Sequence, residues 1–321
     1  MAVRKPKTLD ESELELMAEV AQRYYLDDET KVEIASALGI SRFQVARLLQ
    51  TAKRSGVVRI AIEHPLVGDV ALARRLRAVL GIDEVLLVKA STDITVERQR
   101  LGERAAEFLS THAREGQRVG FSWGRTLIPV VEGLAKLPRM EFVQVSGMVG
   151  NDPLQSPISM LATLSSKSQL TTKALFAPLF SSTPQVADAA RREPAVAEVL
   201  SSYNSLDAAY LSVGSWNPPI NQLVQHMSAS EIDELNSLHP VAEVVGLFFN
   251  ADGDYLHTSL NDRRISISVD QLRDTNEVVA VAGEIGKARA IEAIARSGVI
   301  TALVTTDEVA YDILERDRGQ R

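Results

Sequence analysis

Residues 120–127, GFSWGRTL, join two segments whose patterns decide how the chain is interpreted. The preceding residues, GQRVGF, are typical of a buried strand, and the following TLIPVVEGLA is typical of a helix. The stretch contains Gly-Phe-Ser-Trp-Gly, which matches the G-x-S-x-G turn that presents the nucleophile of serine hydrolases. A turn from strand to helix also exposes free backbone N–H groups that suit an anion. Ser122 is therefore either a nucleophile or part of a turn that holds a ligand.

The hydrolase hypothesis requires an acid and then a histidine after the serine, with the histidine late in the fold. The last histidine is His257, and two strand–helix units follow it. Asp207 with His257 is the one candidate pairing, and neither lies in a convincing catalytic loop. The chain has no cysteine, no HExxH motif and no clustered His/Asp set, so we expect no catalytic residue, no metal and no cofactor.

From about Pro65 onward, short apolar runs alternate with amphipathic segments. The runs expected to be strands are DEVLLVKA, QRVGFS, EFVQVSGM, AAYLSVGS, EVVGLFFN, EVVAVAG and ITALVTTD. The segments expected to be helices include DVALARRLRAVLG, RLGERAAEFLSTHA, LIPVVEGLA, GKARAIEAIARSG and VAYDILER. This alternation predicts an α/β fold with a largely parallel, Rossmann-like sheet covered on both faces. Ligands in such sheets bind at the carboxyl ends of the strands, which is where GFSWGRTL falls.

Several of these loops carry groups that suit a small, anionic, hydroxylated ligand. The turn offers the hydroxyls of Ser122 and Thr126 and the guanidinium of Arg125, which can hold a phosphate by two hydrogen bonds. The segment AGEIGK places Gly283 and Gly286 at an expected helix start, with Lys287 as a point charge. NDRR adds Arg263 and Arg264. Each group has a plainer interpretation as a surface charge or, for Trp123, as packing, but their convergence on strand ends favours a pocket.

The first sixty residues follow a different pattern, that of a helix-turn-helix. ELELMAEVAQRYYL has apolar residues at helical spacing, and DDET is suited to capping the next helix, KVEIASAL. Gly39 then suits a left-handed turn, and Ser41 can cap RFQVARLLQTAKRSG. The following VVRIAIEH alternates enough to be a short strand, which would form a wing.

The expected third helix divides into an apolar and a basic face. Its apolar stripe comprises Val45, Leu48, Leu49 and Ala52. Residues 41–59 contain five basic side chains and no acidic one, although the whole chain has a formal net charge of −7. Arg47 and Gln44 are the candidates for contacts to base edges, with Arg42 beside them. Ser41 and Lys53 suit phosphates, whereas a solvated charged face is the alternative.

Length and composition indicate a two-domain globular protein of 321 residues, with 45% hydrophobic residues. No apolar run approaches the ~18 residues of a membrane span. The first residues show no signal peptide, and the absence of cysteine fits a reducing compartment, so we expect a cytoplasmic protein with no membrane partner.

The order and spacing of six blocks resemble the SorC family of sugar-binding bacterial transcriptional regulators. The blocks are residues 34–60, GIDEVLLV (81–88), GFSWGRTL (120–127), FFNADGDYL (248–256), VAGEIGKARAI (281–291) and LVTTDEVA (303–310). The resemblance implies a winged helix-turn-helix in residues 1–62, and an effector and oligomerisation domain in 63–321 with the fold of ribose-phosphate isomerases and glucosamine-phosphate deaminases. It further implies operator DNA, a sugar, polyol or sugar phosphate effector and a tetramer. The effector contacts that carry over are Ser122, Trp123, Gly124, Arg125, Thr126, Gly147, Asp252, Arg263 and Lys287.

Two features depart from that family pattern. Glu243 stands where the family commonly has aspartate, and LFFN (247–250) replaces an Arg-Phe-Phe-Asp run, so the identity of the sugar is open. Phe43 replaces a small residue or proline, so the operator sequence is open as well. The sequence therefore favours an effector-controlled regulator of a carbohydrate catabolic operon. The alternative is an isomerase-like or deaminase-like enzyme that carries a DNA-binding segment.

Overall fold

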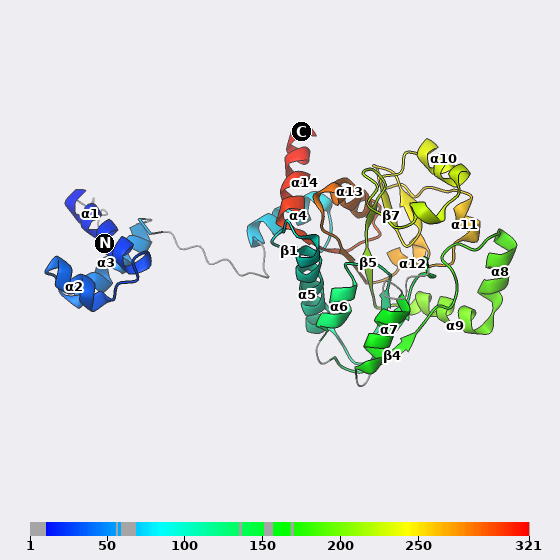
Figure 1. Cartoon of the computed structure of the whole chain (residues 1–321), viewed down its shortest axis with the longest axis horizontal. Helices are drawn as coiled ribbons and strands as arrows, with labels where there is room; N and C mark the ends of the chain where they lie inside the picture. The colour runs from blue at the N-terminus through cyan, green and yellow to red at the C-terminus, as the bar shows by residue number, and fades with distance from the viewer. Residues whose placement is uncertain are drawn as a thin grey trace, which may run out of the picture. The chain divides into compact units, whose positions relative to one another are not determined.

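A computed structural model describes residues 11–55, 57–58, 69–134, 137–150, 157–167 and 170–320 (Figure 1). The chain divides into two compact units, residues 1–63 and 64–321. Each unit has a separate hydrophobic core, and each is considered by itself below.

In the described part of the first unit, three helices are joined by turns with recognisable capping residues. The helices are α1 (Glu11–Tyr25), α2 (Lys31–Leu38) and α3 (Arg42–Ser55). Thr30 caps α2 in a reciprocal box with Glu33, and Gly39 ends it in the left-handed conformation at φ 67°. Ser41 accepts a hydrogen bond from Gln44 N–H at the start of α3. These turns agree with the capping predicted from the sequence, whereas most of the expected wing (57–64) lies outside the described residues.

The second unit is built on a seven-stranded parallel sheet, in the order β1-β10-β9-β5-β2-β3-β4. Its strands are β1 (Glu84–Val88), β2 (Arg118–Phe121), β3 (Met140–Gln144), β4 (Leu170–Lys173), β5 (Ala208–Ser212), β9 (Glu277–Val281) and β10 (Ala302–Thr306). The central strands are buried on both faces, which is why they read as continuous apolar runs. The expected α/β class with a mostly parallel sheet is confirmed.

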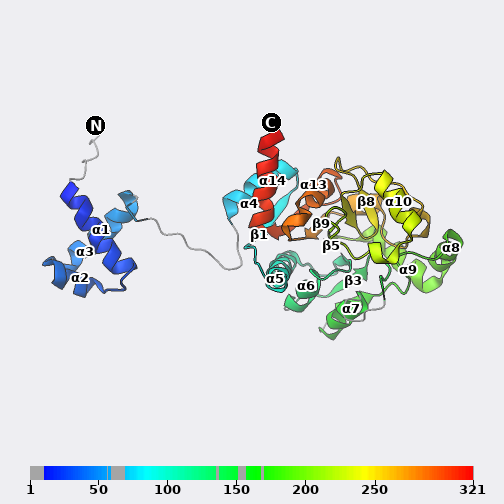
Figure 2. The same ribbon diagram turned by 45° about the horizontal axis from the view of Figure 1, so that its top comes forward.

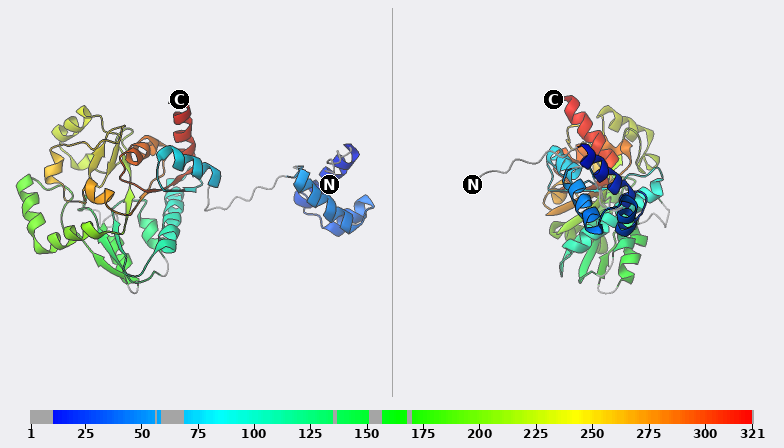
Figure 3. Two further views of the ribbon diagram at one scale, coloured as in Figure 1. Left: turned by 180° about the vertical axis from the view of Figure 1, so that it is seen from behind. Right: turned by 90° about the vertical axis from the view of Figure 1, so that its left-hand side faces the viewer.

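Helices cover both faces of this sheet, and each face has its own hydrophobic core. On one face lie α5 (Ile94–His112), α6 (Ile128–Gly133) and α7 (Pro157–Ser166), which Figure 2 shows side by side. On the other face lie α4 (Val70–Leu80), α9 (Pro194–Ser202), α13 (Ala288–Arg296) and α14 (Asp307–Gln320). The view from behind shows α14 beside α4 (Figure 3).

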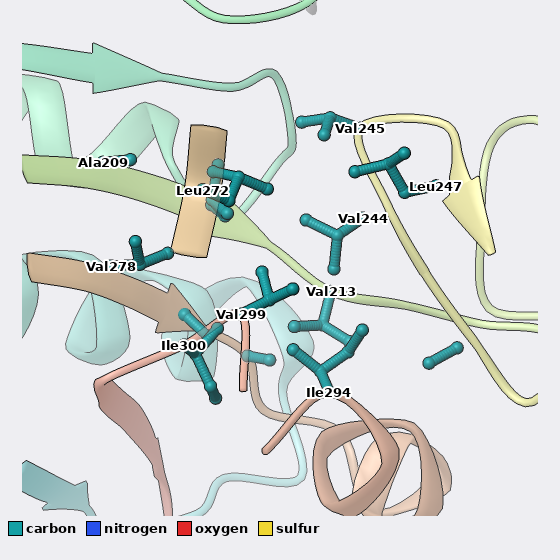
Figure 4. Close-up of a cluster of buried hydrophobic side chains, with 14 of the residues drawn as sticks. Ala209, Val213, Val244, Val245, Leu247, Leu272, Val278, Ile294, Val299 and Ile300 are labelled. Atoms are coloured by element: carbon teal, nitrogen blue, oxygen red, sulfur yellow. The ribbon is translucent and has the colours of Figure 1, made fainter. Parts of the chain in front are cut away.

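A second, three-stranded antiparallel sheet extends from the carboxyl end of β5. It contains β6 (Gly214–Ser215), β7 (Ala242–Val244) and β8 (Leu247–Phe249). The prediction of one strand for EVVGLFFN was wrong, because Val245 and Gly246 have φ of 49° and 80° and form a two-residue hairpin turn. Side chains from this hairpin pack on those of the main sheet and of α12 (Val269–Arg273) and α13 (Figure 4).

The remaining elements lie between these strands along the chain. They are α8 (Pro184–Arg192), α10 (Ala229–Ser237), α11 (Leu260–Arg263) and the short 3₁₀ turns η2 (Tyr203–Ser205), η3 (Val224–His226) and η4 (Ile285–Lys287).

Candidate functional site

The turn after β2 is fixed by hydrogen bonds to the end of β5, the neighbouring strand. The Ser122 hydroxyl donates to the carbonyl of Trp123 (3.2 Å) and accepts from the backbone N–H of Ser212 (3.2 Å). Ser122 is only 2% exposed. None of the four described histidines lines the space around this turn. Ser122 therefore ties two strand ends together and lacks the base that a nucleophile needs.

Gly124 lies where the turn passes closest to β5. Its φ is +149°, which L residues with a side chain rarely adopt, and a Cβ would lie 2.4 Å from Ser212 Oγ. Ser212 Oγ in turn donates to the Trp123 carbonyl (2.8 Å). The glycine predicted from the motif is thus required by a close approach of the backbone.

A cavity opens over this turn, at the carboxyl ends of β2, β5 and β9. After β2 the chain goes on to β3, and after β5 it returns to β9, so the successors of these adjacent strands lie on opposite sides. That makes the gap between β2 and β5 a topological switch point, where open α/β sheets bind their ligands. The lining residues are Arg98, Trp123, Gly124, Arg125, Thr126, Ser212, Val213, Gly214, Ile220, Asn221, Gln222, Glu243, Glu284 and Lys287.

Three cations and two carboxylates face this cavity. The Nζ of Lys287 lies 3.3 Å from Oε1 of Glu284, and the same oxygen lies 3.2 Å from Nη2 of Arg98. Burial lowers the pKa of Lys287, and the Glu284 carboxylate partly offsets that effect. Burial alone would raise the pKa of Glu284, but Lys287 and Arg98 outweigh it and hold that pKa below its usual value. The two cations therefore favour the ionised form of Glu284.

Arg125 differs from these cations because its side chain is exposed and forms no ion pair in the described part of the chain. Its charge contributes to lowering the pKa of Lys287, which places the two cations within electrostatic reach of each other. Thr126 follows it and is 5% exposed in the cavity wall. An incoming anion can therefore use Arg125 without first breaking an ion pair.

Glu243 is a buried carboxyl group in the cavity wall, at 4% exposure. Its Oε1 accepts the backbone N–H of Gly246 (2.7 Å). Burial raises its pKa to about 7, although the Gly246 hydrogen bond and the charge of Lys287 act in the opposite direction. At neutral pH this group can donate or accept a hydrogen bond, which suits the hydroxyls of a polyol or sugar.

Trp123 contributes one unsatisfied polar atom beside the cavity. Its ring packs with Leu179, Leu223 and Phe248, so the packing interpretation of this residue is correct for the ring. Its Nε1–H is buried, and no acceptor for it lies within the described ranges. A buried donor without a partner is costly, and this one is closed off from the cavity's solvent in the structure.

Three of the predicted effector contacts lie away from this cavity. Gly147 packs against the backbone of Pro178, which a Cβ would approach to 2.4 Å. Asp252 lines a separate hollow between the β8 turn and α12. Arg263 pairs with Glu231 of α10 and donates to the carbonyl of Ser181. The structure therefore gathers Trp123, Gly124, Arg125, Thr126 and Lys287 into one cavity wall, with Ser122 beneath them.

The expected helix starts differ in detail from the structure. The helix after the turn, α6, has only six residues and no side-chain cap, and α13 begins at Ala288 after the 3₁₀ turn η4. Lys287 is accordingly in the turn before α13 and is 7% exposed. Anion binding here would depend on side-chain cations more than on helix dipoles.

Sequence reasoning missed Arg98, Ser212, Asn221 and Glu284 as parts of the cavity. Arg98 lies inside α5 and Ser212 ends a strand, so neither belongs to a loop motif. Glu284 belongs to the AGEIGK segment, in which the sequence points to the glycines and the lysine. Its role in the cavity is evident only from its backbone conformation and its ion pairs.

In the first unit, α3 presents the polar face that its sequence predicts. Val45, Leu49 and Ala52 are buried in the unit's core. The exposed side chains include those of Ser41, Arg42, Gln44, Arg47 and Lys53. The Arg42 guanidinium lies over the ring of Phe43 (5.0 Å), and Phe43 is 73% exposed.

The described residues include no group of three or more His, Asp or Glu side chains arranged to hold a metal ion. Among them, no helix is both long and apolar enough to cross a membrane.

Comparison with known proteins gives a consistent result. Residues 64–315 match the protein family described as "Putative sugar-binding domain". The chain is 30% identical over 312 residues to the transcriptional regulator LsrR of Enterobacter sp. (strain 638), covering 94% of both chains. It is 26% identical to the sorbitol operon regulator of Klebsiella pneumoniae, covering 94% of this chain and 98% of that protein.

The fold has close counterparts among solved structures. The full-length sorbitol operon regulator SorC of Klebsiella pneumoniae superposes with a TM-score of 0.73 at 23% identity, over 96% of this chain and all of that one. A sugar-binding domain of a transcriptional repressor from Vibrio fischeri gives a TM-score of 0.70 at 22% identity, over 78% of this chain and all of that one. These proteins are named as transcriptional regulators, not as enzymes.

Proposed function

The chain belongs to the SorC family of sugar-binding transcriptional regulators, and from that premise we propose that it binds operator DNA under the control of a sugar, polyol or sugar phosphate. Residues 1–62 would bind the DNA, and residues 63–321 would bind the effector and form a tetramer. Relatives named for sorbitol and erythritol support a role in a carbohydrate catabolic operon in the bacterial cytoplasm.

The observation that carries the effector half is the cavity at the β2–β5 switch point. It combines the exposed guanidinium of Arg125 with the buried carboxyl of Glu243, whose pKa burial raises to about 7. Such a set binds an anionic group at one end and hydroxyl groups at the other. A phosphorylated sugar or polyol offers both.

The DNA half rests on the exposed face of α3. We assign Arg47 and Gln44, with Arg42, to base edges in the major groove, and Ser41 and Lys53 to phosphates. The Ser41 hydroxyl already caps α3, so its phosphate contact would use the remaining acceptor or donor capacity of that group. A winged helix-turn-helix would complete this surface with residues that follow α3.

A screen of free and phosphorylated sugars and polyols by thermal shift tests the effector half, because a ligand that binds only the folded state raises the apparent melting temperature. DNA retention in a gel, with fragments selected by the protein from a randomised pool, then tests whether the same compound changes DNA affinity. A compound that stabilises the protein without changing DNA affinity would contradict the regulatory proposal.

The variant Arg125→Ala sharpens this test. Loss of the exposed guanidinium should weaken a phosphorylated effector roughly tenfold or more, the value of one charge-assisted hydrogen bond. DNA binding without effector should stay as in the wild type, because Arg125 lies in the other unit. Loss of both responses would instead assign Arg125 a role in folding.

A further inference from the structure

The carboxylate of Glu284 lies between two of the three cations of the cavity. Its Oε1 is 3.2 Å from Arg98 Nη2 and 3.3 Å from Lys287 Nζ. The side chains of Glu284, Arg98 and Lys287 are 21%, 16% and 9% exposed, so water screens these contacts only weakly. A carboxylate thus already occupies the place where these cations would hold the anionic group of a ligand.

The backbone of Glu284 shows that this side chain is kept at a cost. Its φ is +66° and ψ 110°, a conformation that favours glycine and that strains any residue with a Cβ by about 1–3 kcal/mol. The conformation is held by the backbone N–H of Glu284, which donates to Oε1 of Glu97 (2.8 Å). Glu97 is itself buried and also accepts from the N–H of Ser91 (3.2 Å). Glycine could take the same backbone path without strain, so the carboxylate is not needed for the turn itself.

The charge distribution of the cavity follows from this arrangement. Glu284 pairs with both Lys287 and Arg98 and offsets one of their two positive charges, whereas Arg125 is the lining cation without an ion pair in the described residues. A neutral polyol can enter without disturbing these pairs. An anionic ligand that approaches Lys287 or Arg98 is repelled by the carboxylate of Glu284, which already takes one contact from each cation.

We propose that Glu284 is an internal competing anion, whose carboxylate occupies the anion position on Lys287 and Arg98 and thereby lowers the affinity of the cavity for anionic effectors relative to neutral ones. This inference rests on the proposed effector function of the cavity. Glu284 determines specificity, because it selects for ligands whose anionic group forms better hydrogen bonds with these cations than one carboxylate does. Phosphate, with three acceptor oxygens and a higher charge, meets that requirement better than a ligand carboxylate.

Two substitutions separate the effect of the Glu284 charge from the effect of its backbone strain. Glu284→Gln removes the negative charge and keeps the side chain and its positive φ, whereas Glu284→Gly removes both the charge and the strain. Glu292→Gln is the matched control. Glu292 also bridges two cations, Arg296 (3.6 Å) and Arg316 (3.0 Å), but it does not line the cavity.

Inorganic phosphate is titrated into the full-length wild type and the three variants by calorimetry, with the melting temperature and circular dichroism of each variant checking its fold. We expect both Glu284 variants to bind phosphate on the order of tenfold more tightly than the wild type, and Glu292→Gln to bind as the wild type does. Affinity for a neutral polyol found by thermal shift should change less than twofold in all variants.

The outcomes distinguish this inference from the proposed function. Equal phosphate affinity in the wild type and the Glu284 variants, weaker binding in them, or a gain in Glu284→Gly alone would overturn the role as a competing anion and leave the effector function intact. Saturable binding of neutral polyols with no phosphate binding in any variant would also overturn it. If neither phosphate nor any sugar, polyol or sugar phosphate binds, the effector function of the cavity fails as well.

Discussion

The polar face of α3 and the cavity over β2 and β5 both carry several charges, but they hold them in opposite ways. The basic side chains of α3 are exposed, and in the described chain Arg42, Arg47 and Lys53 form no ion pair with an acidic residue. In the cavity, Lys287, Glu284 and Arg98 are mostly buried, and the carboxylate of Glu284 pairs with both cations. The face of α3 can therefore bind a large polyanion whose negative charges pair with these basic side chains. The cavity already contains ion pairs, so that a small anionic ligand that approaches Lys287 or Arg98 must compete with the carboxylate of Glu284.

The largest effect that we expect concerns the cavity, and it is the pH dependence of stability that Glu243 causes. Its pKa is about 7 in the folded protein, above the ordinary value of a carboxyl group in the unfolded chain. The folded state therefore holds the proton more tightly, and the stabilisation from Glu243 is fully present below the ordinary pKa and is lost as pH rises through about 7. Between pH 5 and 8, the free energy of unfolding should fall by on the order of 3 kcal/mol relative to Glu243→Gln.

Denaturant unfolding of the wild type and Glu243→Gln at pH 5, 6, 7 and 8 measures this difference. The wild type has to be compared with Glu243→Gln because burial also raises the pKa of Glu277 and of Glu292. These two groups make the free energy of unfolding fall with pH in both proteins. A difference between the two proteins that does not change with pH would show that Glu243 is ionised throughout, and that the cavity has one more fixed negative charge than we infer.

The contrast between the two regions also explains what the sequence alone could reveal. The face of α3 follows from helical periodicity, because every side chain on it belongs to one continuous helix. The cavity takes side chains from α5, the β2 turn, the end of β5, the β7–β8 hairpin and η4. Local motifs identified the turn and Lys287, but they contain no information on Arg98, which arrives from within a helix.

The elements of the fold, likewise, were predictable only where the local sequence pattern indicates them. Six of the seven apolar runs begin or contain strands of the main sheet, since buried parallel strands are recognised by their composition. The edge strand β4 was missed because Leu170–Lys173 is polar and only partly buried. The run EVVGLFFN was mistaken for one strand because Val245 takes a positive φ in its hairpin turn. A β-branched residue rarely adopts that conformation, so the sequence does not indicate a turn there.

The next prediction concerns the exposed region. Arg47→Ala should lower affinity for selected DNA by about 1–3 kcal/mol for each recognition helix bound, which would abolish retention in a gel at ordinary concentrations. The stability of the protein should change by less than about 0.5 kcal/mol, because the side chain is exposed and alanine favours the helix. Arg75→Ala, an exposed arginine of α4, is the control for the loss of one positive charge. Equal retention of all three proteins would remove α3 from the DNA interface.

The smallest effect we expect is at Ser122, where the hydrolase hypothesis began. A fluorophosphonate should not label Ser122, because its hydroxyl is 2% exposed, already donates to the Trp123 carbonyl and accepts from Ser212 N–H, and has no histidine to activate it among the described residues. Mass spectrometry after incubation, with a known serine hydrolase as the positive control, measures the label. Ser122→Ala should then cost only about 1 kcal/mol of stability, and slightly more if Ser212 N–H stays buried without an acceptor. Covalent labelling at this residue would mean that the turn can open away from β5, and the cavity over it would have to be understood as a catalytic site.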